Sequence, residues 1–194
     1  MRKTSKKNPL FFIFLGVLLL AVGLLSVFGG RIISCVRGIP LSLRYTDELK
    51  AAADRYGLDR RLVAAVVNTE SGFDEKAVSR DGAEGLMQLL PSTAEWIAAM
   101  RGLEYEEGCL FDPETNLDYG CWLLRYLLDR YDGSVRYALI AYNAGHARLE
   151  EWIKTRADEN GDIDIPYPET KNYVKKIEGL IERYGKVYEK ELCD

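Results

Sequence analysis

The stretch that decides the fold runs from Glu70 to Ala94 and reads ESGFDEKAVSRDGAEGLMQLLPSTA, directly after the apolar run LVAAVVNT at 62–69. If that run is helical, Leu62, Val66 and Glu70 are spaced i, i+4 and i+8, so the carboxylate continues an apolar stripe. Loss of hydration there disfavours the charged form and raises the pKa of the carboxyl group. A carboxyl group that keeps its proton can serve as a general acid. The alternative from spacing alone is an ordinary glutamate that turns to water at the end of its helix.

Around this stretch, apolar periodicity and capping residues predict a mainly α fold. Helices are expected at 46–57 with Thr46 as N-cap, at 59–72 with Asp59 as N-cap, from Pro91 with Ser92 and Glu95 as a capping box, from Asp112-Pro113, from Ser134, through 146–154, and from Pro168. The apolar faces expected on the two longest helices are Leu117, Leu124, Leu127, Leu128 and Tyr131, and Val174, Ile177, Leu180, Ile181 and Tyr184. Between 73 and 89, a turn-prone interval leaves room for a short β ribbon only.

The N-terminal segment has a basic start, followed by unbroken apolar or small residues from Pro9 to Gly30. About 20 such residues cross a bilayer as a helix, and a basic flank stays in the cytoplasm. A cleaved signal peptide and lipid modification of Cys35 are the alternatives to an uncleaved, single-pass anchor in the cell membrane. The expected division is a cytoplasmic start at 1–9, a transmembrane anchor at 10–30, a linker at 31–45 and an extracytoplasmic folded domain at 46–194.

Composition restricts the class of function. The chain has 194 residues, enough for one domain, and its formal net charge of -4 without a basic stripe argues against a nucleic-acid partner. Its cysteines, Cys35, Cys109, Cys121 and Cys193, fit no paired-cysteine metal site, and the single His146 builds no histidine cluster. A Cys109–Cys121 disulfide and two small buried thiols are equal alternatives. No metal or organic cofactor is expected.

Four sequence blocks occur in a fixed order: Glu-Ser at 70–71, Gly-Leu-Met-Gln at 85–88, Ala-Tyr-Asn-Ala-Gly at 141–145 and Glu-Thr-x-x-Tyr-Val at 169–174. Together they resemble the catalytic domain of soluble lytic transglycosylases, over roughly 49–184. That resemblance implies a goose-type-lysozyme-like fold in a single catalytic domain. It also implies cleavage of the MurNAc–GlcNAc β-1,4 bond of peptidoglycan without water, with formation of a 1,6-anhydroMurNAc product.

The resemblance also implies the site residues. Glu70 is the expected catalytic residue, acting first as an acid and then as a base. The residues expected to bind substrate or to line the cleft are Ser71, Met87, Gln88, Tyr142, Asn143, Glu169 and Tyr173. Among these, Tyr173 is expected close to the acid. Core packing is the alternative role for Met87, and stabilisation of a turn is the alternative for the Gln88 amide.

Residues beside these blocks carry weaker expectations. Gly82 and Gly85 are expected to let the backbone approach the sugars. His146-Ala147 stands where relatives often carry Pro-Gly, and His146 is expected in a surface loop. Trp152 is expected in the core rather than stacked on a sugar.

Two other functions stay open. A muramidase that admits water needs a second carboxylate, and Asp74, Glu75 and Glu84 are close enough to Glu70 in sequence to supply one. A membrane-tethered module that binds glycan without cleaving it belongs to a different class. The expected partner in all three cases is the peptidoglycan glycan strand.

Overall fold

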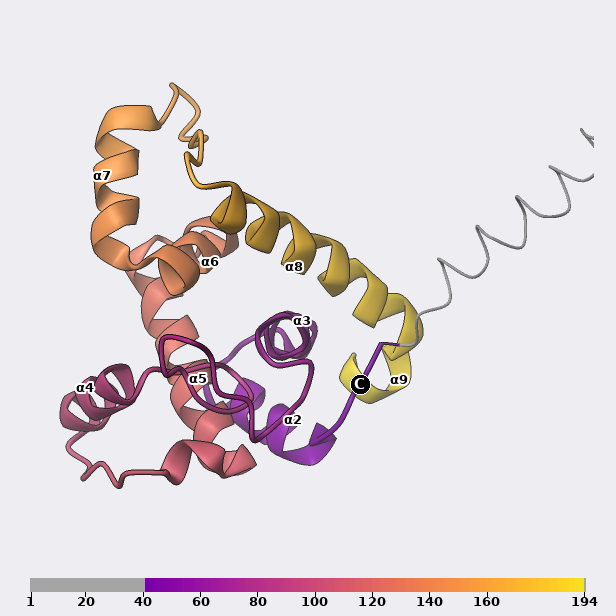
Figure 1. Cartoon of the computed structure of the whole chain (residues 1–194). Helices are drawn as coiled ribbons and strands as arrows, with labels where there is room; N and C mark the ends of the chain where they lie inside the picture. Colours follow the sequence, from indigo (N-terminus) through magenta and orange to yellow (C-terminus); the bar gives the residue numbers. More distant parts are fainter. Residues whose placement is uncertain (1–40, 194) are drawn as a thin grey trace, which may run out of the picture. The chain divides into compact units, whose positions relative to one another are not determined.

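The fold was analysed in a computed structural model that describes residues 41–193. This part of the chain is almost entirely helical (Figure 1). Its helices are α2 (Thr46–Arg55), α3 (Arg60–Glu70), α4 (Pro91–Arg101), the 3-10 helix η1 (Cys109–Phe111), α5 (Pro113–Arg130), α6 (Val135–Ala144), α7 (His146–Arg156), α8 (Pro168–Val187) and α9 (Glu189–Leu192). None of these helices has the length and apolar character that crossing a bilayer requires. The anchor predicted at 10–30 lies outside the described residues.

Capping side chains start several helices where the sequence predicts. The carboxylates of Asp59 and Asp112 accept hydrogen bonds from backbone N–H groups in the first turns of α3 and α5, and Ser134 does the same for α6. Two predicted caps are wrong. The N-cap of α2 is Tyr45, so Thr46 is already helical, and the capping box of α4 does not form. Pro91 occupies the first turn of α4 after an extended Leu90, which leaves Ser92 inside the helix.

Helix α3 is the central element of the fold. Residues 62–67 are all buried, so this helix is covered on every side. Figure 1 shows it nearly end-on, with α8 along one flank and α2 and α5 along the other. Because Glu70 is the last residue of this central helix, its side chain emerges inside the domain rather than at its periphery.

The apolar stripes predicted for α5 and α8 form the surrounding core. All five predicted residues of α5 and its end are buried, and on α8 only Ile181 is left partly exposed. Trp152 is also buried, at 4% exposure, which confirms core packing for this residue. The prediction of a mainly α domain is therefore confirmed at the level of individual helix faces.

The segment 71–90, between α3 and α4, contains isolated bridges of Glu84 with Val78 and Leu89, in place of a continuous ribbon. It is held by the buried Asn116 of α5, whose Oδ1 accepts from the Met87 N–H at 2.7 Å. The Asn116 Nδ2 donates to the carbonyl groups of Glu84 and Leu110. Hydrogen bonds to a buried amide are worth about 1 kcal/mol each and cost more when one is left unmade.

Gly85 is required by this same contact. A Cβ at Gly85 would stand 2.2 Å from the Leu110 carbonyl oxygen and 2.3 Å from the Asn116 Nδ2, closer than any real side chain can sit. The close approach that requires Gly85 is thus to Leu110 of η1 and Asn116 of α5, and an approach of this backbone to the sugars stays a prediction. Gly82 lies in a turn with a φ of +80° and open space around it.

The folded body begins before the predicted boundary at 46. Leu41 is buried in the core, and the Tyr184 hydroxyl donates to the Ser42 carbonyl at 2.6 Å. The Tyr188 hydroxyl bonds the Leu41 carbonyl in the same way. Residues 41–45, assigned to the linker from the sequence, thus belong to the packed domain.

The cysteines of the described part are free thiols. Cys121 is buried, Cys109 is partly buried and Cys193 is exposed. Of the two alternatives for Cys109 and Cys121, the structure contains the thiols rather than the disulfide. Burial raises the pKa of the Cys121 thiol far above its usual range, so it behaves as a small apolar core residue.

Candidate active site

The carboxyl group of Glu70 is the centre of the site. Burial raises its pKa from an ordinary value of 4.5 to about 7, and this outweighs two opposing influences. One is a hydrogen bond from the Tyr173 hydroxyl to Glu70 Oε1 at 2.6 Å. The other is the positive charge of Lys176, one turn further along α8. A carboxyl group in this state can hold its proton at neutral pH and can also release it.

Two tyrosines enclose this carboxyl group. Tyr173 comes from α8 and Tyr142 from α6, and burial raises the pKa of both hydroxyls well above the usual value of 10, with the negative charge of Glu70 adding to the effect. Both hydroxyls therefore stay protonated and act as hydrogen-bond donors. Tyr173 donates to Glu70 itself, while Tyr142 donates to the Met87 carbonyl at 2.8 Å.

Ser71 fixes the end of α3. Its Oγ lies 2.8 Å from the Leu86 carbonyl oxygen, to which it donates, and accepts from the Phe73 N–H at 3.1 Å. These bonds tie Ser71, the residue after Glu70, to Leu86 and Phe73 further along the 71–90 segment. Ser71 is thus placed to position Glu70, through contacts with the protein backbone.

The backbone near both ends of the 71–90 segment is strained. Phe73 has a φ of +68° and Gln88 a φ of +49°, in the left-handed region that favours glycine. Such conformations cost about 1–3 kcal/mol each and persist only where the surroundings impose them. Here the imposing contacts are the full burial of Phe73 and the hydrogen bonds of the Gln88 amide.

The side chains of Met87 and Gln88 both contact the protein itself. The Met87 side chain is fully buried against Gly120, so it fills the core, and only its backbone contacts the site through Tyr142. The Gln88 Nε2 donates to the carbonyl groups of Ala77 and Gly85. Met87 therefore packs in the core, the alternative that the sequence left open. The Gln88 amide stabilises the turn but is partly exposed, so its contact with substrate stays a prediction.

Asn143 lies near the end of α6, and Glu169 lies in the first turn of α8. The exposed Asn143 accepts a hydrogen bond at its Oδ1 from the Thr170 hydroxyl at 2.8 Å, which joins the end of α6 to the first turn of α8. Glu169 is exposed in that same first turn.

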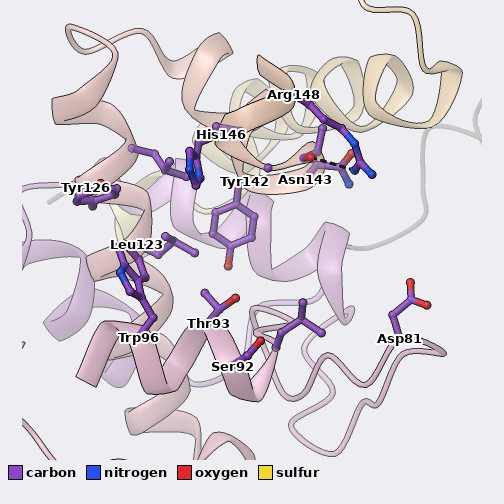
Figure 2. Close-up of a pocket in the computed structure, with 15 residues that line it drawn as sticks. Asp81, Ser92, Thr93, Trp96, Leu123, Tyr126, Tyr142, Asn143, His146 and Arg148 are labelled. Carbon is purple, nitrogen blue, oxygen red and sulfur yellow. Dashed lines mark hydrogen bonds between the residues drawn. The ribbon is translucent and has the colours of Figure 1, made fainter. Parts of the chain in front are cut away.

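A pocket of about 640 Å³ opens beside Tyr142 (Figure 2). One end is largely aromatic, with Trp96 and Tyr126 among its lining residues and His146 on the same side, and the other end carries Asn143 and Arg148. Figure 2 shows the Tyr142 ring between the two ends. His146 is exposed as predicted, although it is the first residue of α7 rather than part of a loop.

Two of the three carboxylates considered as a second catalytic group, Asp74 and Glu75, have other partners. The Asp74 side chain accepts from the Lys76 N–H, and Glu75 accepts from the Tyr45 hydroxyl at 2.5 Å. The Glu84 Oε2 is buried without a hydrogen-bond partner, and its charge acts on Tyr105 and Cys109. None of the three is among the groups that shift the pKa of Glu70.

Metal binding has no obvious place in this part of the molecule. Within residues 41–193, no three or more His, Cys, Asp or Glu side chains are grouped in a way that would hold a metal ion.

Fold and site together define a class of protein: an α-helical domain built around one buried, proton-holding carboxyl group at the end of its central helix. The family model described as "Transglycosylase SLT domain" matches residues 47–165. The chain belongs to this family, which confirms the resemblance carried by the four sequence blocks.

Individual lytic transglycosylases are also similar to this chain. The soluble lytic murein transglycosylase of Escherichia coli K12 is 33% identical over 144 residues, which are 70% of this chain and 22% of that protein. Membrane-bound lytic murein transglycosylase C of Histophilus somni is 38% identical over 137 residues, 65% of this chain and 38% of the relative. The solved 70 kDa soluble lytic transglycosylase of Escherichia coli superposes with a TM-score of 0.69 at 31% identity, covering 75% of this chain and 25% of that one. The chain thus spans well under half of the length of these proteins.

Proposed function

We propose that this protein is a membrane-anchored peptidoglycan lytic transglycosylase that cleaves the MurNAc–GlcNAc β-1,4 bond and forms a 1,6-anhydroMurNAc end. Membership of the family and the activities named for its relatives support the reaction class. The observation that carries the catalytic assignment is the raised pKa of Glu70, whose carboxyl group is held by a tyrosine hydroxyl and not by a paired cation.

In the first step, protonated Glu70 donates its proton to the glycosidic oxygen. The bond between C1 of MurNAc and that oxygen breaks, the GlcNAc part leaves as an alcohol, and positive charge develops at C1. The carboxylate that remains stabilises this charge, while the Tyr173 hydroxyl, 2.6 Å from Oε1, keeps the carboxylate in place.

In the second step, the Glu70 carboxylate accepts the proton of the C6 hydroxyl of the same MurNAc residue. The C6 oxygen forms a bond to C1, which closes the anhydro ring and returns Glu70 to its protonated state. No water is consumed, and the attack gains from being intramolecular. A pKa of about 7 suits both halves of this cycle, since the group gives up and takes back one proton.

The remaining site residues support this carboxyl group or the substrate. Ser71 and Tyr142 position the acid and the 71–90 segment through their bonds to the Leu86 and Met87 carbonyls. Asn143, at the mouth of the pocket, has an amide that is exposed and can bond a sugar while Oδ1 accepts from Thr170. Glu169, exposed in the first turn of α8, lines the approach.

The location of the reaction is also part of the proposal. An anchor at 10–30 would hold the catalytic domain outside the cytoplasm and close to the membrane, where the wall is assembled. The naming of several relatives as membrane-bound transglycosylases supports this placement.

The test is product analysis by mass spectrometry after the full chain, in mild detergent, has acted on purified peptidoglycan. Wild type should release anhydro-muropeptides. Glu70→Gln, which keeps the side-chain shape but has no transferable carboxyl proton, should release at least about a thousandfold less. Glu151→Gln, an exposed change on α7 outside the pocket, is the matched control and should leave the yield unchanged.

Other products would identify other functions. Products heavier by one water would identify the protein as a muramidase. A second carboxylate, which is not among the site residues proposed above, would then have to activate the water. Retained glycan binding without any product in wild type would leave a tethered binding module.

A further inference from the structure

The two ends of the pocket beside Tyr142 differ in the chemistry of their side chains. At one end the Trp96 ring meets the stacked pair of Trp122 and Tyr126 edge-on, with ring centroids 5.3–5.6 Å apart. Such an aromatic end suits the apolar face of a sugar ring. At the other end, the exposed side chains of Asn143 and Arg148 line the pocket, and we call this pair the Arg148 seat. The proposed reaction acts at Glu70 and assigns no task to Arg148.

Arg148 is the charged member of the seat. One guanidinium nitrogen donates to the Ala144 carbonyl at 3.1 Å, and the group lies over the Tyr167 ring, 5.8 Å from its centroid. These contacts hold the guanidinium in one orientation, and they leave further N–H donors of its fork available. No carboxylate in the described part of the chain forms an ion pair with Arg148.

The surroundings favour an anion at this end. Arg148 and His146 lie in the first turn of α7, where the helix has no side-chain cap. Backbone N–H groups and the helix dipole there add to the attraction for negative charge. The one acidic residue lining the pocket, Asp81, belongs to the 71–90 segment, and Figure 2 shows it well apart from the Arg148 guanidinium.

We propose that the Arg148 seat binds a carboxylate carried by the substituent of a muramic acid residue, and that the protein thereby prefers glycan that bears this charge. The inference rests on the proposed function, since it concerns the same substrate. N-acetylmuramic acid carries a lactyl ether that ends in a carboxylate, or, when this is amide-linked, a peptide with carboxylates of its own. Both sources present the planar group that an arginine fork recognises.

Binding measurements on the catalytically blocked Glu70→Gln chain test the seat without relying on cleavage. Three glycan preparations serve as probes: peptide-bearing strands, strands stripped of peptide so that the lactyl carboxylates are free, and stripped strands with those carboxylates converted to neutral methylamides. Adding Arg148→Gln should weaken binding of at least one charged preparation by about tenfold, the value of a charge-assisted hydrogen bond, and should change binding of the neutral one less than about twofold.

Two further variants make the result specific. Arg148→Lys keeps the charge and should retain part of the preference for charged strands. Arg156→Gln removes the same charge from the far end of α7, outside the pocket, and should change nothing.

The pattern of loss decides the outcome. A loss confined to peptide-bearing strands assigns the seat to the stem peptide, and a loss on stripped strands assigns it to the lactyl group. An equal loss on all three preparations, or no loss on any, overturns the proposal. If the charge-dependent pattern appears while wild type cleaves no strand, the seat stands and the proposed transglycosylase function fails.

Discussion

Two enclosed carboxylates of this domain have opposite electrostatic surroundings. Asp118 of α5 is buried beside α2, and Glu70 of α3 is partly buried beside α8. Burial raises the pKa of both, yet the pKa of Asp118 ends below its ordinary value and that of Glu70 ends at about 7. Asp118 contacts Arg55 at 2.5 Å and Arg101 at 2.6 Å, and it accepts from the Tyr56 hydroxyl.

The difference between the two sites is in their partners. Around Asp118, two guanidinium groups and a hydroxyl outweigh the loss of hydration, so the carboxylate is a fixed charge that joins α2, α4 and α5. Around Glu70, one neutral hydroxyl and one more distant lysine do not outweigh the loss of hydration. The comparison shows that burial alone does not create a proton donor: the neighbourhood must also lack a paired cation.

The largest expected effect comes from neutralising Glu70. The folded pKa of about 7 lies above the ordinary 4.5, so wild type keeps the full stability contribution of protonated Glu70 below pH about 4.5 and loses it as pH rises through 7. The Gln side chain does not ionise, so Glu70→Gln keeps this stability contribution at every pH. The variant should therefore be more stable than wild type at pH 8.5 by about 3 kcal/mol. Denaturant unfolding at pH 4 and 8.5 measures this difference. A variant no more stable than wild type at pH 8.5 would show that Glu70 is charged at little cost.

Neutralising Asp118 should have the opposite sign. Asp118→Asn removes a carboxylate that two arginines need, and we expect a loss of about 2 kcal/mol at pH 7, reduced from a fully buried pair because the Arg55 side chain is 54% exposed. Since the folded pKa is lowered, this contribution is present above pH about 4 and is lost as pH falls through the folded value. The same unfolding series reports it. A penalty that persists unchanged at pH 2 would contradict the assignment.

Removing the hydroxyl that holds Glu70 should have a smaller effect, on rate. Tyr173→Phe takes away a hydrogen bond that lowers the pKa of Glu70, so the alkaline limb of the pH–rate profile should move to higher pH. Loss of positioning should also reduce kcat at pH 6 by about tenfold. A limb that stays in place or moves to lower pH would mean that Tyr173 does not act on the acid.

The smallest effect is expected at Lys176. Its positive charge is the last of the influences on Glu70, and its side chain is exposed, so water and salt screen it. Lys176→Gln should move the alkaline limb in the same direction as Tyr173→Phe, by less, and the shift should vanish in 1 M salt. Lys175→Gln, also exposed on α8, is the control. An equal shift in both variants would point to net charge rather than to a local interaction.

The sequence predicted the position of Glu70 better than it predicted the surroundings of this residue. Glu70 extends the stripe of Leu62 and Val66, and helical periodicity is enough to bring such a residue into the domain. Its expected neighbour Tyr173 also lies within hydrogen-bond distance. Helix starts with a capping carboxylate or serine were found for the same reason, because their geometry is local.

Local rules of this kind do not predict the contacts of side chains in the loop at 71–90. Asn116, nearly 30 residues later, holds the Met87 N–H, and the Ala77 and Gly85 carbonyl groups hold the Gln88 amide. No periodicity applies between 71 and 90. Asn116 itself was missed, although its spacing of i and i+4 with Gly120 on the apolar face of α5 was a signal of close packing. The pocket residues Trp96 and Arg148 were missed too, since residues of α4 and α7 line one pocket only in the folded chain.

The most direct test of the account is a titration of the Glu70 carboxyl carbon by ¹³C NMR, assigned by its disappearance in Glu70→Gln. The account predicts a midpoint of about 7 for Glu70, with Asp118 in the same spectra titrating below its ordinary value. A Glu70 midpoint at or below 4.5 would contradict it, because a carboxyl group already ionised at neutral pH could not deliver the proton that the proposed reaction requires.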